Sequence, residues 1–125
     1  ETTEDTGEKV CVIVGYSGPF SGRLGMRVPQ ELAAVLAANM LGIDEDDPHA
    51  EQKAVDAVKE LVNMTCGNLL PEIAGPEPEF AIGVPEAVSQ EEYEEFEKND
   101  TPQGSGRVKV AVEDFEVRIA FGVEG

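Results

Sequence analysis

Strands occur in adjacent pairs along this sequence, and that arrangement limits the possible fold more than any other feature. Residues 9–17 are almost continuously apolar and rich in β-branched side chains, which is typical of a strand buried inside a sheet. After a turn at Gly18 and Pro19, apolar and polar residues alternate over residues 20–28, which predicts a second strand with one buried and one wet face. The wet positions would be Ser21, Arg23, Gly25 and Arg27. We expect the two strands to form a hairpin.

Two helical segments follow this hairpin. Pro29 suits a first helical turn and Gly42 a helix end, so we expect a helix between them. Asp47 stands before a proline, a pairing that favours a capped helix start. We expect this second helix to cover residues 48–70 and to stop at Pro71, because proline cannot donate a helical hydrogen bond.

The rest of the chain returns to strands. Residues 80–84 predict a short strand, and the glutamate-rich residues 85–105 predict a short exposed helix and a loop. Alternation over residues 108–112 and 115–121 predicts a second hairpin, with Asp114 in a tight turn. The order β-β-α-α-β-β-β is an α+β pattern: a largely antiparallel sheet built from two hairpins, with two long helices packed on one face.

Composition narrows the functional classes. The 125 residues suit one domain over residues 1–125, and the net charge of −17 disfavours nucleic acid and anionic membrane surfaces as partners. No run of about 18 apolar residues predicts a membrane span, and residues 1–8 do not resemble a secretory leader, so we expect a cytoplasmic protein. Cys11 and Cys66 suit a reducing compartment, although the sequence leaves a bridge between them open.

The second predicted helix carries a narrow polar strip. With Asp56 as zero, Glu60 falls at about +40°, Asn63 at about −20° and Gly67 at about +20° around the helix axis. We expect the first three side chains to project into solvent. The opposite, core-facing side would hold Val55, Val58, Leu61, Val62, Thr65 and Leu69.

Such a strip is most simply the wet face of an amphipathic helix, but two residues favour a function. Asn is a mediocre residue inside a helix, and Gly67 costs about 1 kcal/mol relative to Ala. Other candidate sites are weaker. The acidic residues 44–47 lack the glycine and final glutamate of a calcium loop, and His49 is a lone histidine, so helix capping and solvation explain them better. The glycine-rich hairpin is not followed directly by a helix, as a phosphate-binding loop would be.

The motif Asp56-x-x-x-Glu60-x-x-Asn63, continued by Gly67 and Asn68, resembles the signature of the CheC/CheX family of chemotaxis phosphatases. The resemblance extends to the Val-Ile-Val-Gly-Tyr-Ser-Gly hairpin, to residues 36–42 and to the closing Phe-Glu-Val-Arg-Ile strand, so that it covers most of residues 9–122. A single copy of the motif resembles CheX. The family has a long N-terminal helix that this chain begins too late to include, and residues 85–105 do not match the family pattern.

The resemblance implies a protein that hydrolyses the aspartyl phosphate of a CheY-type response regulator. Asn63 would orient the attacking water and Glu60 would engage the regulator's active-site lysine. Asp56, Gly67 and Asn68 would contact the regulator without a catalytic role. The chain itself would bind no metal or other cofactor, because Mg²⁺ would be held by the phosphorylated regulator. The resemblance also implies a homodimer.

Two other classes of function stay open on the sequence. A non-catalytic relative, similar to the flagellar-switch proteins, would bind a response regulator without hydrolysing its phosphate. A small-molecule-binding module would show a deep apolar pocket in place of an exposed second helix. A shared fold decides neither alternative.

Overall fold

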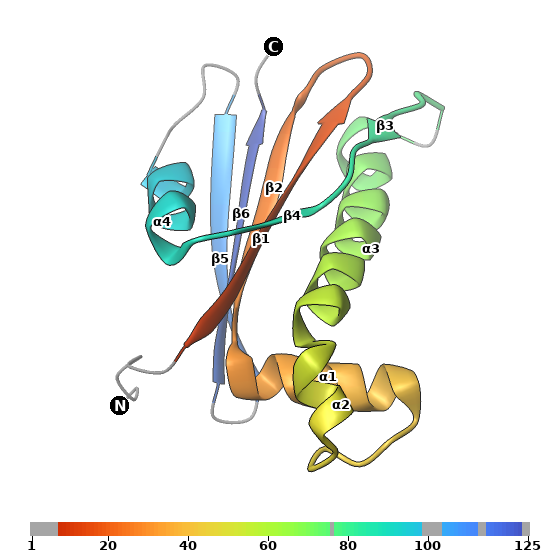
Figure 1. The fold of residues 1–125 in the computed structure, drawn as a ribbon. Helices are drawn as coiled ribbons and strands as arrows, with labels where there is room; N and C mark the ends of the chain where they lie inside the picture. Colours follow the sequence, from red (N-terminus) through yellow and green to blue (C-terminus); the bar gives the residue numbers. More distant parts are fainter. Residues whose placement is uncertain (1–7, 76, 99–103, 113–114, 124–125) are drawn as a thin grey trace.

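The computed structural model describes residues 8–75, 77–98, 104–112 and 115–123, and it confirms an α+β fold (Figure 1). The strands are β1 (Lys9–Ser17), β2 (Gly22–Pro29), β3 (Ala81–Ile82), β4 (Glu86–Val88), β5 (Gly104–Val112) and β6 (Phe115–Val123). The helices are α1 (Gln30–Leu41), α2 (Pro48–Gln52), α3 (Ala54–Ala74) and α4 (Gln90–Lys98). Of the helices that the structure describes, none combines the length and the apolar character that a membrane span needs.

The strands form one sheet in the order β3-β1-β2-β6-β5, and β4 also pairs with β1, at Cys11–Ile13, whereas β3 pairs with Tyr16 and Ser17. All of these pairings are antiparallel. Both predicted hairpins are confirmed, β1 with β2 and β5 with β6, and β2 joins them by pairing with β6. The predicted turn at Asp114 lies outside the described residues.

The larger core lies between the sheet and helices α1 and α3, with α3 along the sheet and α1 crossing at the end where β2 stops (Figure 1). Side chains of β1 and β2 pack there against side chains of α1 and α3. Its most enclosed members include Val12, Val14, Leu24, Val28, Ala33, Val58 and Val62. This layer of apolar contacts holds α3 firmly along the sheet.

An aromatic cluster closes one end of this core. The Tyr16 hydroxyl donates a hydrogen bond of 2.9 Å to the carbonyl of Gly122, and its ring stacks on Phe121 at 5.6 Å between centroids. Gly22 makes this possible, because a Cβ there would lie 2.0 Å from the Gly122 carbonyl oxygen and 2.4 Å from the Tyr16 hydroxyl. Close packing, and not phosphate binding, therefore explains the glycine at position 22.

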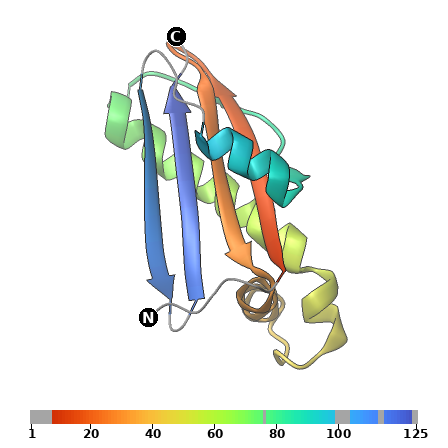
Figure 2. The same ribbon diagram turned by 90° about the vertical axis from the view of Figure 1, so that its left-hand side faces the viewer.

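Helix α4 covers the opposite face of the sheet, and the sequence did not predict this position for it (Figure 2). Residues 90–98 do form the expected short helix, but Tyr93, Phe96 and Glu97 are buried, so the prediction of an exposed helix was wrong. For the same reason the predicted wet face of β2 was wrong at Gly25 and Arg27, which are buried on the side that α4 covers, whereas Arg23 is exposed as predicted. A Cβ at Gly25 would lie 2.8 Å from Phe96 and 3.0 Å from Tyr93.

Polar contacts fasten α4 to the sheet. The Tyr93 hydroxyl donates to the carbonyl of Arg118 at 3.2 Å, and Arg118 Nε donates to Glu97 Oε2 at 3.1 Å, with a second guanidinium–carboxylate contact beside it. The helix begins with a capping box, because Glu92 N–H donates to Ser89 Oγ and Ser89 N–H donates to Glu92 Oε1. The second core is thus pinned at its edges by hydrogen bonds.

The helix boundaries confirm two predictions. Gly42 ends α1 in the left-handed region, with φ 72°. Asp47 caps α2 by accepting the N–H of His49 at 2.9 Å, and this hydrogen bond holds the pKa of the Asp47 carboxyl below its usual value. Helix capping therefore accounts for this part of the acidic run.

The single helix predicted over residues 48–70 was wrong in two ways. Lys53 leaves helical geometry, at φ −100° and ψ 9°, so α2 and α3 are separate helices, and both pack against α1. At the other end, Pro71 lies inside α3, which continues to Ala74. Burial of Leu70 helps to explain this, because tertiary contacts hold the last turns against the cost of about 3 kcal/mol that a proline imposes.

The two cysteines are free and buried in different cores. Cys11 lies under α4 with Tyr93 and Phe96, whereas Cys66 faces the larger core from α3. Burial raises the pKa of the Cys11 thiol to about 11 and also raises the pKa of the Cys66 thiol. The bridge that the sequence left open is not formed.

Candidate functional site

Helix α3 presents one row of residues to the core and another to solvent. Four residues advance about 40° around an α-helix, so a row at this spacing winds slowly along the surface. The buried row is Ala54, Val58, Val62, Cys66 and Leu70. The exposed row is Asp56, Glu60, Met64, Asn68 and Glu72. Of the polar strip predicted from the sequence, Asp56 and Glu60 lie in this exposed row, Gly67 is exposed beside it, and Asn63 is half-buried.

This winding corrects the predicted core face. Val58 and Val62 are buried as expected, whereas Val55 is 36% exposed and Leu61, Thr65 and Leu69 are only half-buried. Cys66 and Leu70, which the straight projection left out, are buried. Which residues of α3 are buried depends on the angle at which the helix crosses the sheet, and a local sequence pattern does not predict that angle.

Glu60 and Asn63 are three residues apart, so their side chains are neighbours on the helix surface. Glu60 is exposed, and Asn63 is half-buried. The expectation that Asp56, Glu60 and Asn63 all project freely into solvent holds for the two acids and fails in part for the amide. A solvent-exposed carboxylate therefore stands beside an amide that is partly covered.

The amide oxygen of Asn63 is in an unfavourable environment. This Oδ1 atom is buried, and it has no hydrogen-bond partner among the described residues. A buried carbonyl oxygen without a donor costs about 1–3 kcal/mol of stability. An amide that is unpaired in this way loses no existing hydrogen bond at that oxygen when a new donor arrives.

Asp56 has a simple structural role available. It lies in the first turn of α3, where a negative charge interacts favourably with the helix dipole, and its Oδ2 lies 3.8 Å from Lys53 Nζ. Both side chains are largely exposed, so this ion pair is weak. This weak contact leaves the Asp56 carboxylate open to solvent.

Gly67 is exposed, as is Asn68 beside it. A Cβ at position 67 would meet only Ile82 Cδ1, at 3.8 Å, which is an ordinary van der Waals distance. The described residues thus leave room for alanine there, and the glycine's cost of about 1 kcal/mol in a helix is not explained by packing within the described chain.

Met64 belongs to the same surface and was missed by the sequence reasoning. It is 54% exposed between Glu60 and Asn68 in the exposed row. Its position four residues after Glu60 was a signal that could have found it, because an apolar side chain there has no core to face. We define the α3 surface as Asp56, Glu60, Asn63, Met64, Gly67, Asn68 and Glu72.

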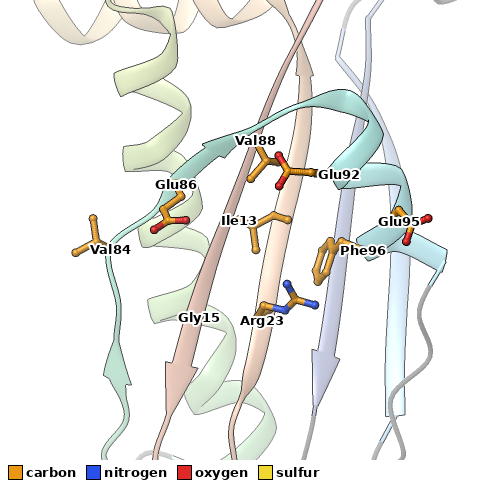
Figure 3. Close-up of a pocket in the computed structure, with 9 residues that line it drawn as sticks. All are labelled: Ile13, Gly15, Arg23, Val84, Glu86, Val88, Glu92, Glu95 and Phe96. Atoms are coloured by element: carbon orange, nitrogen blue, oxygen red, sulfur yellow. The ribbon is translucent and has the colours of Figure 1, made fainter.

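A hollow of about 550 Å³ lies on the other face of the sheet (Figure 3). Its base includes Ile13, Val88 and Phe96, and its rim carries Glu86, Glu92, Glu95 and Arg23. The Arg23 guanidinium lies 4.9 Å from the centre of the Phe96 ring. This hollow is wide and rimmed by charge, whereas the small-molecule alternative required a deep apolar pocket in place of an exposed α3.

Metal binding is not supported by the side chains around α3. In the described part of the chain, no three His, Cys, Asp or Glu side chains gather as a metal site requires. His49 Nδ1 lies 2.9 Å from Asp47 Oδ1 at the start of α2, which is a local contact of the helix cap.

Comparisons with known proteins agree with this geometry. The family model described as "Chemotaxis phosphatase CheX" matches residues 10–105. No curated protein matches the sequence.

Three solved structures have a similar fold. CheX from Vibrio vulnificus has a TM-score of 0.68 and 19% identity, over 98% of this chain and 82% of that chain. CheX from Desulfovibrio desulfuricans has a TM-score of 0.66 and 20% identity, over 99% and 81%. The CheX–CheY–BeF3–Mg²⁺ complex from Borrelia burgdorferi has a TM-score of 0.66 and 19% identity, over 100% and 80%.

Proposed function

The chain belongs to the CheX family of chemotaxis phosphatases, and we propose that it accelerates hydrolysis of the aspartyl phosphate of a CheY-type response regulator. The observation that carries this proposal is the exposed Glu60 beside Asn63 on the outward side of α3, at the spacing of the family signature. A chain that only binds a regulator would not require this carboxylate–amide pair.

In the proposed reaction, the α3 surface docks over the regulator's active site. Glu60 pairs with the regulator's active-site lysine, and this contact brings Asn63 close to the phosphoryl group. The regulator holds Mg²⁺, as the complex of the Borrelia relative with CheY, BeF3 and Mg²⁺ suggests for this class of partner. Positioning and charge neutralisation supply most of the rate in phosphoryl transfer, so the chain need provide no covalent chemistry.

In this proposal, Asn63 orients the attacking water molecule. Its Oδ1 accepts a hydrogen bond from the water, whose oxygen attacks phosphorus as the bond to the aspartyl oxygen breaks. The products are the free aspartate and inorganic phosphate, and the water proton passes to phosphate or solvent because a neutral amide is too weak a base to hold it. Because Oδ1 is unpartnered in the described chain, it gains a hydrogen bond on turning toward this water.

The direct test follows phosphate loss from phosphorylated CheY-type regulators of the same organism with and without this protein. We expect Asn63→Ala to fold and to lose the acceleration, because no group replaces the amide oxygen. Asn39→Ala is the matched control, since Asn39 is an exposed asparagine on α1. Asn63→Ala activity within a few-fold of the parent would remove Asn63 from the mechanism.

Glu60→Ala should act mainly on binding. We expect it to raise the Kd for the regulator bearing BeF3⁻ and Mg²⁺ by about tenfold or more, because one charge-assisted contact is lost. Glu94→Ala, on α4 at the opposite face of the sheet, is the matched control for removing one acid. An unchanged Kd for Glu60→Ala would contradict its docking role.

The same experiments separate the non-catalytic alternative. A parent protein that binds the regulator tightly yet leaves its rate of phosphate loss unchanged would be a binding protein, similar to the flagellar-switch relatives. Cytoplasmic location follows for the proposal because the phosphorylated partner acts there. The homodimer stays a prediction, and light scattering of the purified protein tests it.

A further inference from the structure

We propose that the carbonyl of Gly67 is a backbone acceptor left open by Pro71, and that it receives a lysine or arginine side chain of the docked regulator. This inference rests on the proposed function and adds a second anchoring point, on the same helix, to the contact at Glu60. It concerns main-chain atoms, which no side-chain motif reveals.

Pro71 creates this acceptor through its covalent structure. Inside an α-helix, residue 71 would donate its N–H to the carbonyl of residue 67, but proline has no N–H. The proline ring also crowds that carbonyl, and carbonyls displaced in this way tilt outward toward solvent. The regular hydrogen bond at position 67 is therefore impossible even though α3 continues to Ala74.

Gly67 makes the open carbonyl accessible. It has no side chain to shield its own main chain, and Gly67, Asn68 and Pro71 are all exposed. Among the described residues, a methyl group at position 67 would approach only Ile82 Cδ1, at 3.8 Å, so contacts inside the described chain do not demand glycine. Glycine and proline four residues apart both weaken the helix, and together they expose one acceptor.

Charge identifies the kind of group that this acceptor would receive. The last turn of α3, which begins one turn after Gly67, carries partial negative charge and contains no basic residue to offset it. Glu72 and the amide of Asn68 lie in the exposed row next to Gly67. A cationic donor on the partner satisfies the carbonyl and the local negative potential together, which a neutral donor would not.

The helix also sets the distance between the two anchors. Gly67 follows Glu60 by seven residues, which places them about 10 Å apart along the helix axis. The regulator should therefore carry a second lysine or arginine about 10 Å from its active-site lysine, on the surface that meets α3.

Two substitutions at one position test the acceptor. Pro71→Ala and Pro71→Gly both restore the N–H that competes for the Gly67 carbonyl, but alanine favours the helix by about 1 kcal/mol more than glycine does. We expect both to raise the Kd for the regulator bearing BeF3⁻ and Mg²⁺ by about tenfold, with the rate at saturation within about twofold of the parent. Pro48→Ala is the matched control, because Pro48 lies in the first turn of α2, where an N–H has no helical partner.

A direct readout uses glycine labelled with ¹³C at the carbonyl. The Gly67 signal, assigned by its loss in Gly67→Ala, should shift when the regulator binds, whereas the signals of Gly42 and Gly75 beyond the ends of α1 and α3 should stay in place. A Gly67 signal that does not move, or a Kd within twofold of the parent for both Pro71 variants, overturns the inference. Weaker binding by Pro71→Ala alone also overturns it, because helix stiffness would then be the cause.

Parent protein and Asn63→Ala are assayed in parallel, so that the two proposals can fail separately. An active parent with an inactive Asn63→Ala, but with unaffected Pro71 variants, removes only this inference. A parent that neither binds the regulator nor accelerates its dephosphorylation removes the proposed function, and the second anchor with it.

Discussion

The covered oxygen of Asn63 predicts that Asn63→Ala makes the protein more stable while it removes the proposed activity. The substitution deletes a buried acceptor that has no partner among the described residues, which should recover about 1 kcal/mol or more. Alanine is also the better helix former by up to about 0.7 kcal/mol. The half-buried amide contributes little apolar contact, and its Cβ is retained in alanine. The net gain is therefore about 1–2 kcal/mol.

For a chain of 125 residues, this gain corresponds to a rise in Tm of about 3–8 °C. Urea and thermal unfolding of the parent, Asn63→Ala and Asn39→Ala measure it. The Asn39→Ala control, on the exposed side of α1, contains the helix-propensity gain without the buried oxygen, so the difference between the two variants isolates that oxygen. Equal gains for both variants, or a loss of stability for Asn63→Ala, would refute this account of the amide.

Two further predictions concern the core under α4. Phe96→Ala should destabilise the protein by about 3 kcal/mol, because it removes the ring that packs on Tyr93 and beneath Arg23. The folded variant should keep the α3 surface and its activity. A loss of stability below about 1 kcal/mol in urea unfolding would contradict this packing role. Burial raises the pKa of Cys11 from 9.0 to about 11, so its contribution to stability is complete below pH 9 and is lost as the pH rises through 11. Urea midpoints should fall less steeply over this interval in Cys11→Ala than in the parent, and parallel profiles would disprove the assignment.

The sequence supports the hairpins and the polar strip because both depend on local periodicity. The β-branched, apolar residues 9–17 indicated a buried strand, and the alternation after Gly18 placed the next strand beside it. The spacing of Asp56, Glu60 and Asn63 likewise put the two acids on the solvent side of one helix without any knowledge of the sheet, although the amide is half-buried.

Local periodicity misled where a distant element changed the environment. Gly25 and Arg27 follow the pattern of wet positions on β2, but α4 returns from a later part of the chain and buries them. A sequence pattern records how neighbouring residues alternate, and it contains no information about which face a remote helix will cover. Glutamates on the outer side of α4 also hid the apolar pair Tyr93 and Phe96 that faces the sheet.

By itself, then, the sequence determined the paired strands, the capped start of α2 and the outward row that carries Glu60, because hydrogen-bonding geometry and side-chain period are local properties. Only the tertiary structure decided that α3 continues through Pro71, that its buried row winds toward Cys66 and Leu70, and that the Asn63 oxygen is covered. Each of these depends on how a helix lies against a sheet, and the free energy of that contact is large enough to override the preference of a single residue.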